Sequence, residues 1–221
     1  MRLIRNQDDL DQGLQALVQA DPRLVPIAAA AGPLPLRLME PGFAGLSFVI
    51  VSQMISKASA AAIWSRMSAA GPVTAQAWLA CPPKTMATFG LSRAKVATLT
   101  RVAEAVSASE LDLEAICRLD AVSAIRQLTA LPGIGPWSAE VYLLVCGGHS
   151  DIFPSGDVAL QASLAKGLTL AERPTQSVAA AIATPWAPWR SVAARLFWAY
   201  YSVTLRREIA PLASPPSAPN C

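Results

Sequence analysis

The chain has 221 residues and a net charge of +3, and 53% of its residues are hydrophobic while only 15% are charged. That length is ample for a buried core, and no apolar run reaches the roughly 20 residues that a membrane span needs. The N-terminus becomes acidic at Asp8 and Asp9, too early for a signal peptide. We therefore expect a globular, cytoplasmic protein without a membrane partner, and the small positive charge is compatible with a polyanionic ligand.

Apolar residues recur at helical spacing along most of the chain, and no strand-like alternation is found. We expect an amphipathic helix at 8–20, followed by a Pro-rich, non-helical brace at 32–42. Further helices are predicted at 43–52, 57–67, 74–80, 83–89, 92–107, 113–119, 122–130, 136–144, 157–167, 175–183 and 188–206. The fold class is therefore all-α, with a disordered tail at 208–221.

The most informative segment is the turn Leu131-Pro-Gly-Ile-Gly-Pro-Trp-Ser-Ala139. Gly133 and Gly135 permit a positive φ or a close backbone approach, and Pro136 suits the first turn of a helix. Two short helices joined by this turn leave free N–H groups at a helix N-terminus, which is a natural anion site. Glycine turns alone are common, so this segment by itself is also compatible with a bend that binds nothing.

A single carboxylate, Asp157, stands at the predicted start of the next helix, in Phe153-Pro-Ser-Gly-Asp157. A fixed negative charge beside a sugar would stabilise the oxocarbenium-like transition state of N-glycosidic cleavage and could orient a water. Asp is equally a good N-cap. The residues alone leave both roles open, and one side chain can fill both.

The turn followed by Asp157 resembles the helix-hairpin-helix DNA glycosylases, and within them the 3-methyladenine DNA glycosylase II group. Separate blocks carry the same resemblance in the same order: Phe43–Arg66 with its Gln-x-Ile-Ser loop, Phe89–Val96, Trp186–Ser191, and Phe197-Trp198. The resemblance implies a two-lobed, all-α fold with a DNA cleft between the lobes. It also implies residues 43–207 as the glycosylase domain, with the hairpin at 122–147, after an N-terminal helix and brace at 1–42.

The same resemblance implies the residues that contact DNA and the damaged base. Asp157 is the expected catalytic residue, and Met54 occupies the position of the wedge that fills the gap left by an extruded base. The expected DNA contacts are Gly133, Ile134, Gly135, Trp137, Ser138, Gln53, Met54 and Ser56. The expected base pocket is formed by Trp137, Trp198, Val141 and Tyr142. Val141 stands where these glycosylases carry a further pocket Tyr. Without the resemblance, Met54 would be taken for a core residue at a helix junction.

Two features found in other branches of this superfamily are absent here, and both absences bear on the expected chemistry. Trp137 stands where the bifunctional members of the superfamily carry a lysine nucleophile, so we expect no Schiff-base lyase step. The four cysteines, Cys81, Cys117, Cys146 and Cys221, lack the spacing of an iron–sulfur cluster. No cofactor is expected to be required. The hairpin of such proteins often binds Na⁺ or K⁺ through main-chain carbonyls, here those of Thr129, Leu131 and Ile134.

The resulting hypothesis is a monomeric, monofunctional glycosylase of base-excision repair that acts on double-stranded DNA at the nucleoid. It would excise alkylated purines of the 3-methyladenine and 7-methylguanine type and leave an abasic site. The alternatives are a glycosylase for deaminated or mismatched bases and a non-catalytic hairpin protein that only binds DNA.

Overall fold

The computed structural model describes residues 2–204, and the regular secondary structure in that range is helical. The only β-type pairing within it is an isolated bridge between Leu3 and His149. The helices are α1 (Gln7–Ala20), α2 (Leu24–Ala31), α3 (Phe43–Ser52), α4 (Lys57–Ala69), α5 (Ala75–Ala80), α6 (Pro83–Thr88), α7 (Arg93–Ser107), α8 (Leu113–Ile116), α9 (Ala121–Thr129), α10 (Pro136–Val145), α11 (Val158–Gly167), α12 (Gln176–Ala183), the 3₁₀ helix η1 (Thr184–Trp186) and α13 (Arg190–Thr204).

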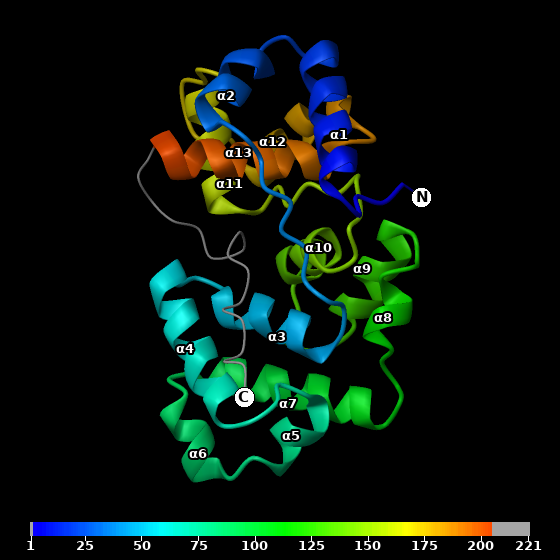
Figure 1. Cartoon of the computed structure of the whole chain (residues 1–221), viewed down its shortest axis with the longest axis vertical. Helices are drawn as coiled ribbons and strands as arrows, with labels where there is room; N and C mark the ends of the chain where they lie inside the picture. Colours follow the sequence, from blue (N-terminus) through cyan, green and yellow to red (C-terminus); the bar gives the residue numbers. More distant parts are fainter. Residues whose placement is uncertain (1, 205–221) are drawn as a thin grey trace.

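The helices form two groups, which confirms the expected two-lobed, all-α architecture. Figure 1 shows α1, α2, α11, α12 and α13 at one end of the molecule and α3 to α7 at the other. In the first group α13 packs against α1, α2 and α11; in the second, α3 packs against α4 and α7. The hairpin helices α9 and α10 lie between the groups, and α10 also contacts α3. The predicted tail at 208–221 lies outside the described residues.

Helix α3 forms the centre of the second group. Its sequence, FAGLSFVIVS, is apolar on nearly every face, and every residue from Gly45 to Ser52 is buried. An all-round apolar helix must be covered on all sides, and α4, α7 and α10 supply that cover. The helix ends at Ser52, and the C-cap residue Gln53 has an extended backbone that leads into the loop before α4. The predicted bounds of this helix are confirmed.

Helix α2 lies in a stretch for which the sequence analysis predicted no element, between the helix expected at 8–20 and the brace expected at 32–42. Pro26 is the third residue of α2, where the backbone N–H has no acceptor within the helix and its absence costs nothing. Leu24 and Ile27 are buried, and the helix packs against α13. Tertiary burial of this short apolar face therefore stabilises a helix that the sequence analysis did not predict.

None of the helices in the described part of the chain combines the length and the hydropathy that a bilayer span requires. Four tryptophans outside the expected base pocket are buried: Trp64, Trp78, Trp186 and Trp189. Trp186 stacks on Phe197 with ring centroids 5.4 Å apart, and this contact joins η1 to α13. These rings stabilise the lobes that carry the site.

Candidate active site

The glycine-rich turn joins α9 to α10 as predicted. Gly133 has φ +101°, and a Cβ at this position would overlap the side chain of Thr98 on α7. Both facts require glycine here. Gly135 differs, because it is the extended N-cap of α10 with φ −88°, and a Cβ there would meet nothing within 4 Å. Pro136 occupies the first helical turn as expected.

The turn leaves several backbone N–H groups without a hydrogen-bond partner among the described residues. Within residues 2–204, no acceptor pairs with the N–H of Gly133, Gly135 or Trp137. The N–H of Ile134 differs, since it donates to the Leu131 carbonyl at 3.1 Å, and the Ile134 side chain is buried. Free N–H groups and the positive end of α10 together make an anion site. Ile134 contributes to it by closing the turn and not by donating its own N–H.

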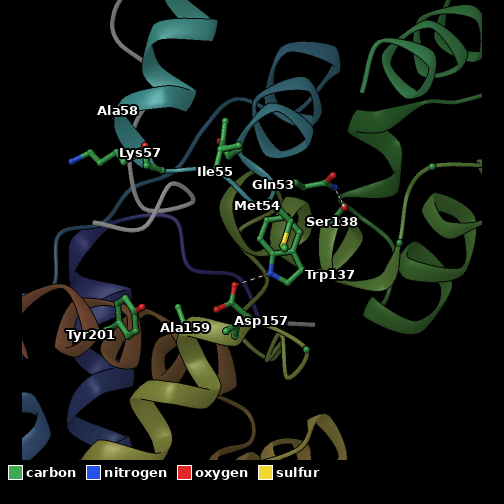
Figure 2. A pocket seen from close by; sticks show the side chains of 16 residues that line it. Gln53, Met54, Ile55, Lys57, Ala58, Trp137, Ser138, Asp157, Ala159 and Tyr201 are labelled. Atoms are coloured by element: carbon green, nitrogen blue, oxygen red, sulfur yellow. Dashed lines mark hydrogen bonds between the residues drawn. The ribbon is translucent and has the colours of Figure 1, made fainter. Parts of the chain in front are cut away.

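Asp157 is the N-cap of α11, and it is only 6% exposed. Its Oδ1 accepts the Leu160 backbone N–H at 2.9 Å, so the predicted capping role is confirmed. Two indoles also donate to the carboxylate: Nε1 of Trp137 to Oδ2 at 2.7 Å, and Nε1 of Trp198 to Oδ1 at 3.3 Å. Figure 2 shows Trp137 above the carboxylate with the first of these bonds drawn. Neutral donors thus orient Asp157.

Residues 53–56 form a short loop between α3 and α4. Met54 is 98% exposed and has φ +57°, a conformation uncommon for a side chain of this size. The amide of Gln53 donates to Oγ of Ser138 on α10, so the loop is tied to the hairpin helix. Ser56 is the N-cap of α4 and accepts the Ser59 N–H at 3.1 Å. The alternative in which Met54 is a core residue is therefore wrong.

These features surround one pocket of about 870 Å³. It is lined by residues 52–58 of the loop and the adjoining helices, by the hairpin residues Gly133, Gly135, Trp137 and Ser138, by residues 156–159, and by Tyr201. Both lobes therefore contribute walls. Figure 2 shows Asp157 between Trp137 on one side and Tyr201 on the other, while the amine of Lys57 points away from Asp157.

Three of the predicted pocket residues do not line this pocket. Val141 and Tyr142 are fully buried in the core, because α10 turns their side chains away from the opening. The Tyr142 hydroxyl accepts the Gly42 N–H at 2.9 Å and donates to the Leu113 carbonyl at 3.1 Å. Trp198 is also fully buried and contacts Asp157. The prediction of Val141, Tyr142 and Trp198 as pocket walls is corrected accordingly.

Tyr201 is the wall that sequence reasoning missed. It lies on α13 three residues after Trp198, which is the spacing that places two side chains on one helix face. Because Trp198 reaches Asp157 from that face, the same spacing could have indicated Tyr201. Lys57, the first residue of α4, also lines the pocket without having been singled out.

Asp151, the first carboxylate before Asp157 in the sequence, pairs with Arg190 at 2.6 Å and does not line the pocket. Cys81, Cys117 and Cys146 are free thiols. Residues 2–204 contain no group of three or more His, Cys, Asp or Glu side chains placed to hold a metal ion. Of the three carbonyls considered for a monovalent cation, that of Leu131 already accepts the Ile134 N–H and keeps one lone pair.

Comparisons with known proteins agree with this geometry. No protein-family model matches the chain. A Mycobacterium tuberculosis protein named "Probable bifunctional transcriptional activator/DNA repair enzyme AlkA" is 34% identical over 110 residues, which are 50% of this chain and 21% of that protein. The "DNA-3-methyladenine glycosylase" of Bacillus subtilis is 28% identical over 116 residues, 52% of this chain and 38% of that protein. The chain thus covers well under half of each of these relatives.

Solved structures match over nearly the whole chain. The 3-methyladenine DNA glycosylase Mag1 of Schizosaccharomyces pombe, solved with abasic DNA, superposes with a TM-score of 0.79 at 23% identity, covering 86% of this chain and 95% of that chain. A DNA-3-methyladenine glycosidase from Bacillus halodurans gives 0.75 at 25% identity, covering 96% and 97%. The resemblance inferred from the sequence is confirmed in both sequence and fold.

Proposed function

We propose that this chain, which has the fold of the helix-hairpin-helix DNA glycosylases, is a monofunctional DNA glycosylase that excises alkylated purines and leaves an abasic site. The observation that carries the proposal is the position of Asp157, a carboxylate oriented by three donors and lining the same pocket as an exposed Met54 and the open face of the hairpin. The similarity to proteins named as 3-methyladenine glycosylases supports the same activity.

Binding would begin at the hairpin. The N–H groups of Gly133, Gly135 and Trp137 have no described acceptor, and the open space beside Gly135 lets a phosphate approach the backbone. Such contacts position a duplex without reading its sequence. A monovalent cation held by the carbonyls of Thr129, Leu131 and Ile134 would add positive charge at the same turn. DNA binding as proposed here does not depend on that cation.

Extrusion of the base would follow. A glycosylase cannot reach the glycosidic bond inside a stacked duplex, so the damaged nucleotide must leave the helix and its gap must be filled. Met54 is an apolar side chain, 98% exposed, at the mouth of the pocket. Apolar wedges of this kind enter base steps. The Gln53 amide is bound to Ser138, so in this structure it helps to hold the loop.

The extruded base would lie between Trp137 and Tyr201, the aromatic rings that line the pocket. Stacking on such rings is worth about 1–3 kcal/mol per base. An alkylated purine carries positive charge, and both the faces of the rings and the carboxylate of Asp157 favour a cation. The pocket therefore suits a cationic base better than a neutral one.

Asp157 would then act on the sugar. As the C1′–N bond breaks, its electron pair leaves with the base and positive charge develops on the deoxyribose. The fixed carboxylate stabilises that charge more than the ground state. A water attacks C1′, and Asp157 orients it and accepts its proton. Because the cationic base is already a good leaving group, one carboxylate suffices where sugar hydrolases use two.

The test is a comparison of released bases. Purified protein is incubated with duplexes that carry 3-methyladenine and 7-methylguanine and with duplexes that carry uracil or hypoxanthine, and free bases are quantified. We expect release from the methylated duplexes at least tenfold faster than from the others. Preferential release of uracil or hypoxanthine would assign deaminated bases as the substrate. Duplex binding without release of any base would contradict the proposal and support the alternative of a non-catalytic DNA-binding protein.

A further inference from the structure

Helix α7 contacts both of the elements to which DNA binding is assigned, although none of its residues lines the pocket. The half-buried Lys95 extends its amine to the loop, where Nζ donates to the carbonyls of Val51 at 2.7 Å and Gln53 at 2.8 Å. These carbonyls belong to the end of α3 and to the residue directly before Met54. Carbonyls at a helix C-terminus lack partners within the helix, and a cation there is favoured by the helix dipole.

The same face of α7 contacts the hairpin. Thr98 fills the space beside Gly133, so that a Cβ on Gly133 would overlap it. The guanidinium of Arg101 approaches the carbonyl of Pro132, with Nη1 at 3.5 Å. Lys95, Thr98 and Arg101 follow one another at intervals of three residues, which places them along one side of a helix. One face of α7 therefore contacts the Met54 loop through Lys95 and the hairpin turn through Thr98 and Arg101.

A direct link closes the arrangement, because the Gln53 amide donates to Ser138 on α10. The loop needs this support. Met54 has φ +57° and an almost fully exposed side chain, so packing of its own side chain cannot hold the backbone in place. An uncommon backbone conformation persists only where its surroundings over-determine it, and here the hydrogen bonds of Lys95 and Gln53 do so.

We propose that Lys95 is a positioning residue for base extrusion, which fixes the Met54 loop at a set distance from the hairpin. This inference rests on the proposed glycosylase function and assigns a role to a lysine that does not itself line the pocket. Through Lys95, the Met54 loop, which would enter the duplex, is fixed to α7. The hairpin turn, which would hold the DNA backbone, contacts the same helix through Thr98. Loss of the amine should release the loop and leave the hairpin, supported by Thr98, unchanged.

The experiment compares Lys95→Met, which keeps the length of the side chain but removes its donors, with Lys95→Arg, which retains donors. Lys84→Met on α6 is the matched control, because Lys84 is exposed and does not line the pocket. For each variant, single-turnover excision is measured on the same lesion in duplex and in single-stranded DNA. Affinity for an undamaged duplex and melting temperature are measured in parallel.

We expect Lys95→Met to lower excision from duplex DNA about tenfold or more and from single strands less than twofold, with duplex affinity unchanged. Lys95→Arg should recover part of the loss, and Lys84→Met should behave as wild type. Equal losses on both substrates, or no loss on either, would overturn the proposal. Should Lys95→Met fail to fold, Lys95→Gln, which keeps one amide donor, is expected to show the same selective loss in smaller degree, and equal losses again overturn it.

A second readout separates this inference from the proposed function. A duplex with 2-aminopurine at the target position reports extrusion by an increase in fluorescence, without any chemical step. Wild-type protein should increase the signal and Lys95→Met should not. A wild-type protein that extrudes 2-aminopurine but releases no base from the lesion-containing duplexes would contradict the glycosylase function alone. An undiminished increase with Lys95→Met would contradict the role of Lys95 alone.

Discussion

The indole of Trp137 donates a 2.7 Å hydrogen bond from Nε1 to Oδ2 of Asp157, which joins the first turn of the hairpin helix to the N-cap of α11. Two segments whose functions were inferred separately from the sequence therefore meet at one carboxylate. Because Trp137 also lines the pocket, it contacts both the group assigned to chemistry and the space assigned to the base.

Asp157→Asn should lower the rate of base release by orders of magnitude while affinity for duplex DNA holds or rises. Removing the charge removes stabilisation of the sugar cation, and loss of a negative charge favours binding of a polyanion. The Asn oxygen can still cap α11, but its NH₂ group would face the Trp137 N–H, so stability should fall by roughly 1–2 kcal/mol. Single-turnover excision, duplex affinity and melting temperature check this. Near wild-type excision by a folded variant would show that Asp157 acts only as the N-cap of α11.

Gly135→Ala should weaken binding to all duplexes to a similar extent while the protein stays folded. A Cβ at Gly135 meets nothing in the free protein, but it would occupy the space through which a phosphate approaches the backbone. Gly133→Ala is the contrasting variant, because φ +101° and the overlap with Thr98 should destabilise the fold itself. Thermal melting and duplex titrations separate the two effects. Unchanged affinity of Gly135→Ala would exclude contact between a phosphate and this residue.

Met54→Ala should reduce excision from duplex DNA more than from single strands, since only a duplex leaves a gap to be filled. Melting temperature should not fall, because a side chain that is 98% exposed contributes little packing. Leu79→Ala removes another exposed apolar side chain, on α5 and away from the pocket, and is the control. If Met54→Ala loses activity equally on both substrates, the wedge assignment is wrong.

Borohydride should trap no covalent adduct with DNA, and strands should break only after alkali treatment. Trp137 provides no amine at the position of the lyase lysine. Lys57 is the lysine that lines the pocket, and its amine points away from Asp157. Adduct formation is scored on denaturing gels. Trapping that is abolished by Lys57→Met would show a lyase step through that amine and contradict the monofunctional assignment.

Glu140→Gln should stabilise the protein above neutral pH. Burial raises the pKa of the Glu140 carboxyl from 4.5 to about 7. Between these values the folded state holds a proton that the unfolded chain releases, so the free energy of unfolding falls as pH rises through that window. The variant lacks this loss and should be more stable by about 1 kcal/mol or more at pH 8, and not at pH 4. Melting temperatures across this range test it, with the exposed Glu104→Gln as control. A variant that melts like wild type at pH 8 would contradict it.

Local signals in the sequence determined most of the helices and the positions of the motifs. The all-round apolar run of α3, the glycine turn before Pro136, and the capping chemistry of Asp157 are properties of neighbouring residues, and the structure has each of them as predicted. Local signals failed at α2, because a proline near a helix start is tolerated only if the first turn falls at the right residue and the apolar face is buried.

Only the tertiary structure decided which side chains share the pocket. Val141 and Tyr142 lie close to Trp137 in sequence, yet the rotation of α10 buries them in the core, while Tyr201 reaches the pocket from α13. The contacts of Lys95 with the loop and of Thr98 with Gly133 join segments more than thirty residues apart. A sequence pattern reports spacing along one element, whereas a site depends on how several elements pack, and that packing is fixed by the core as a whole.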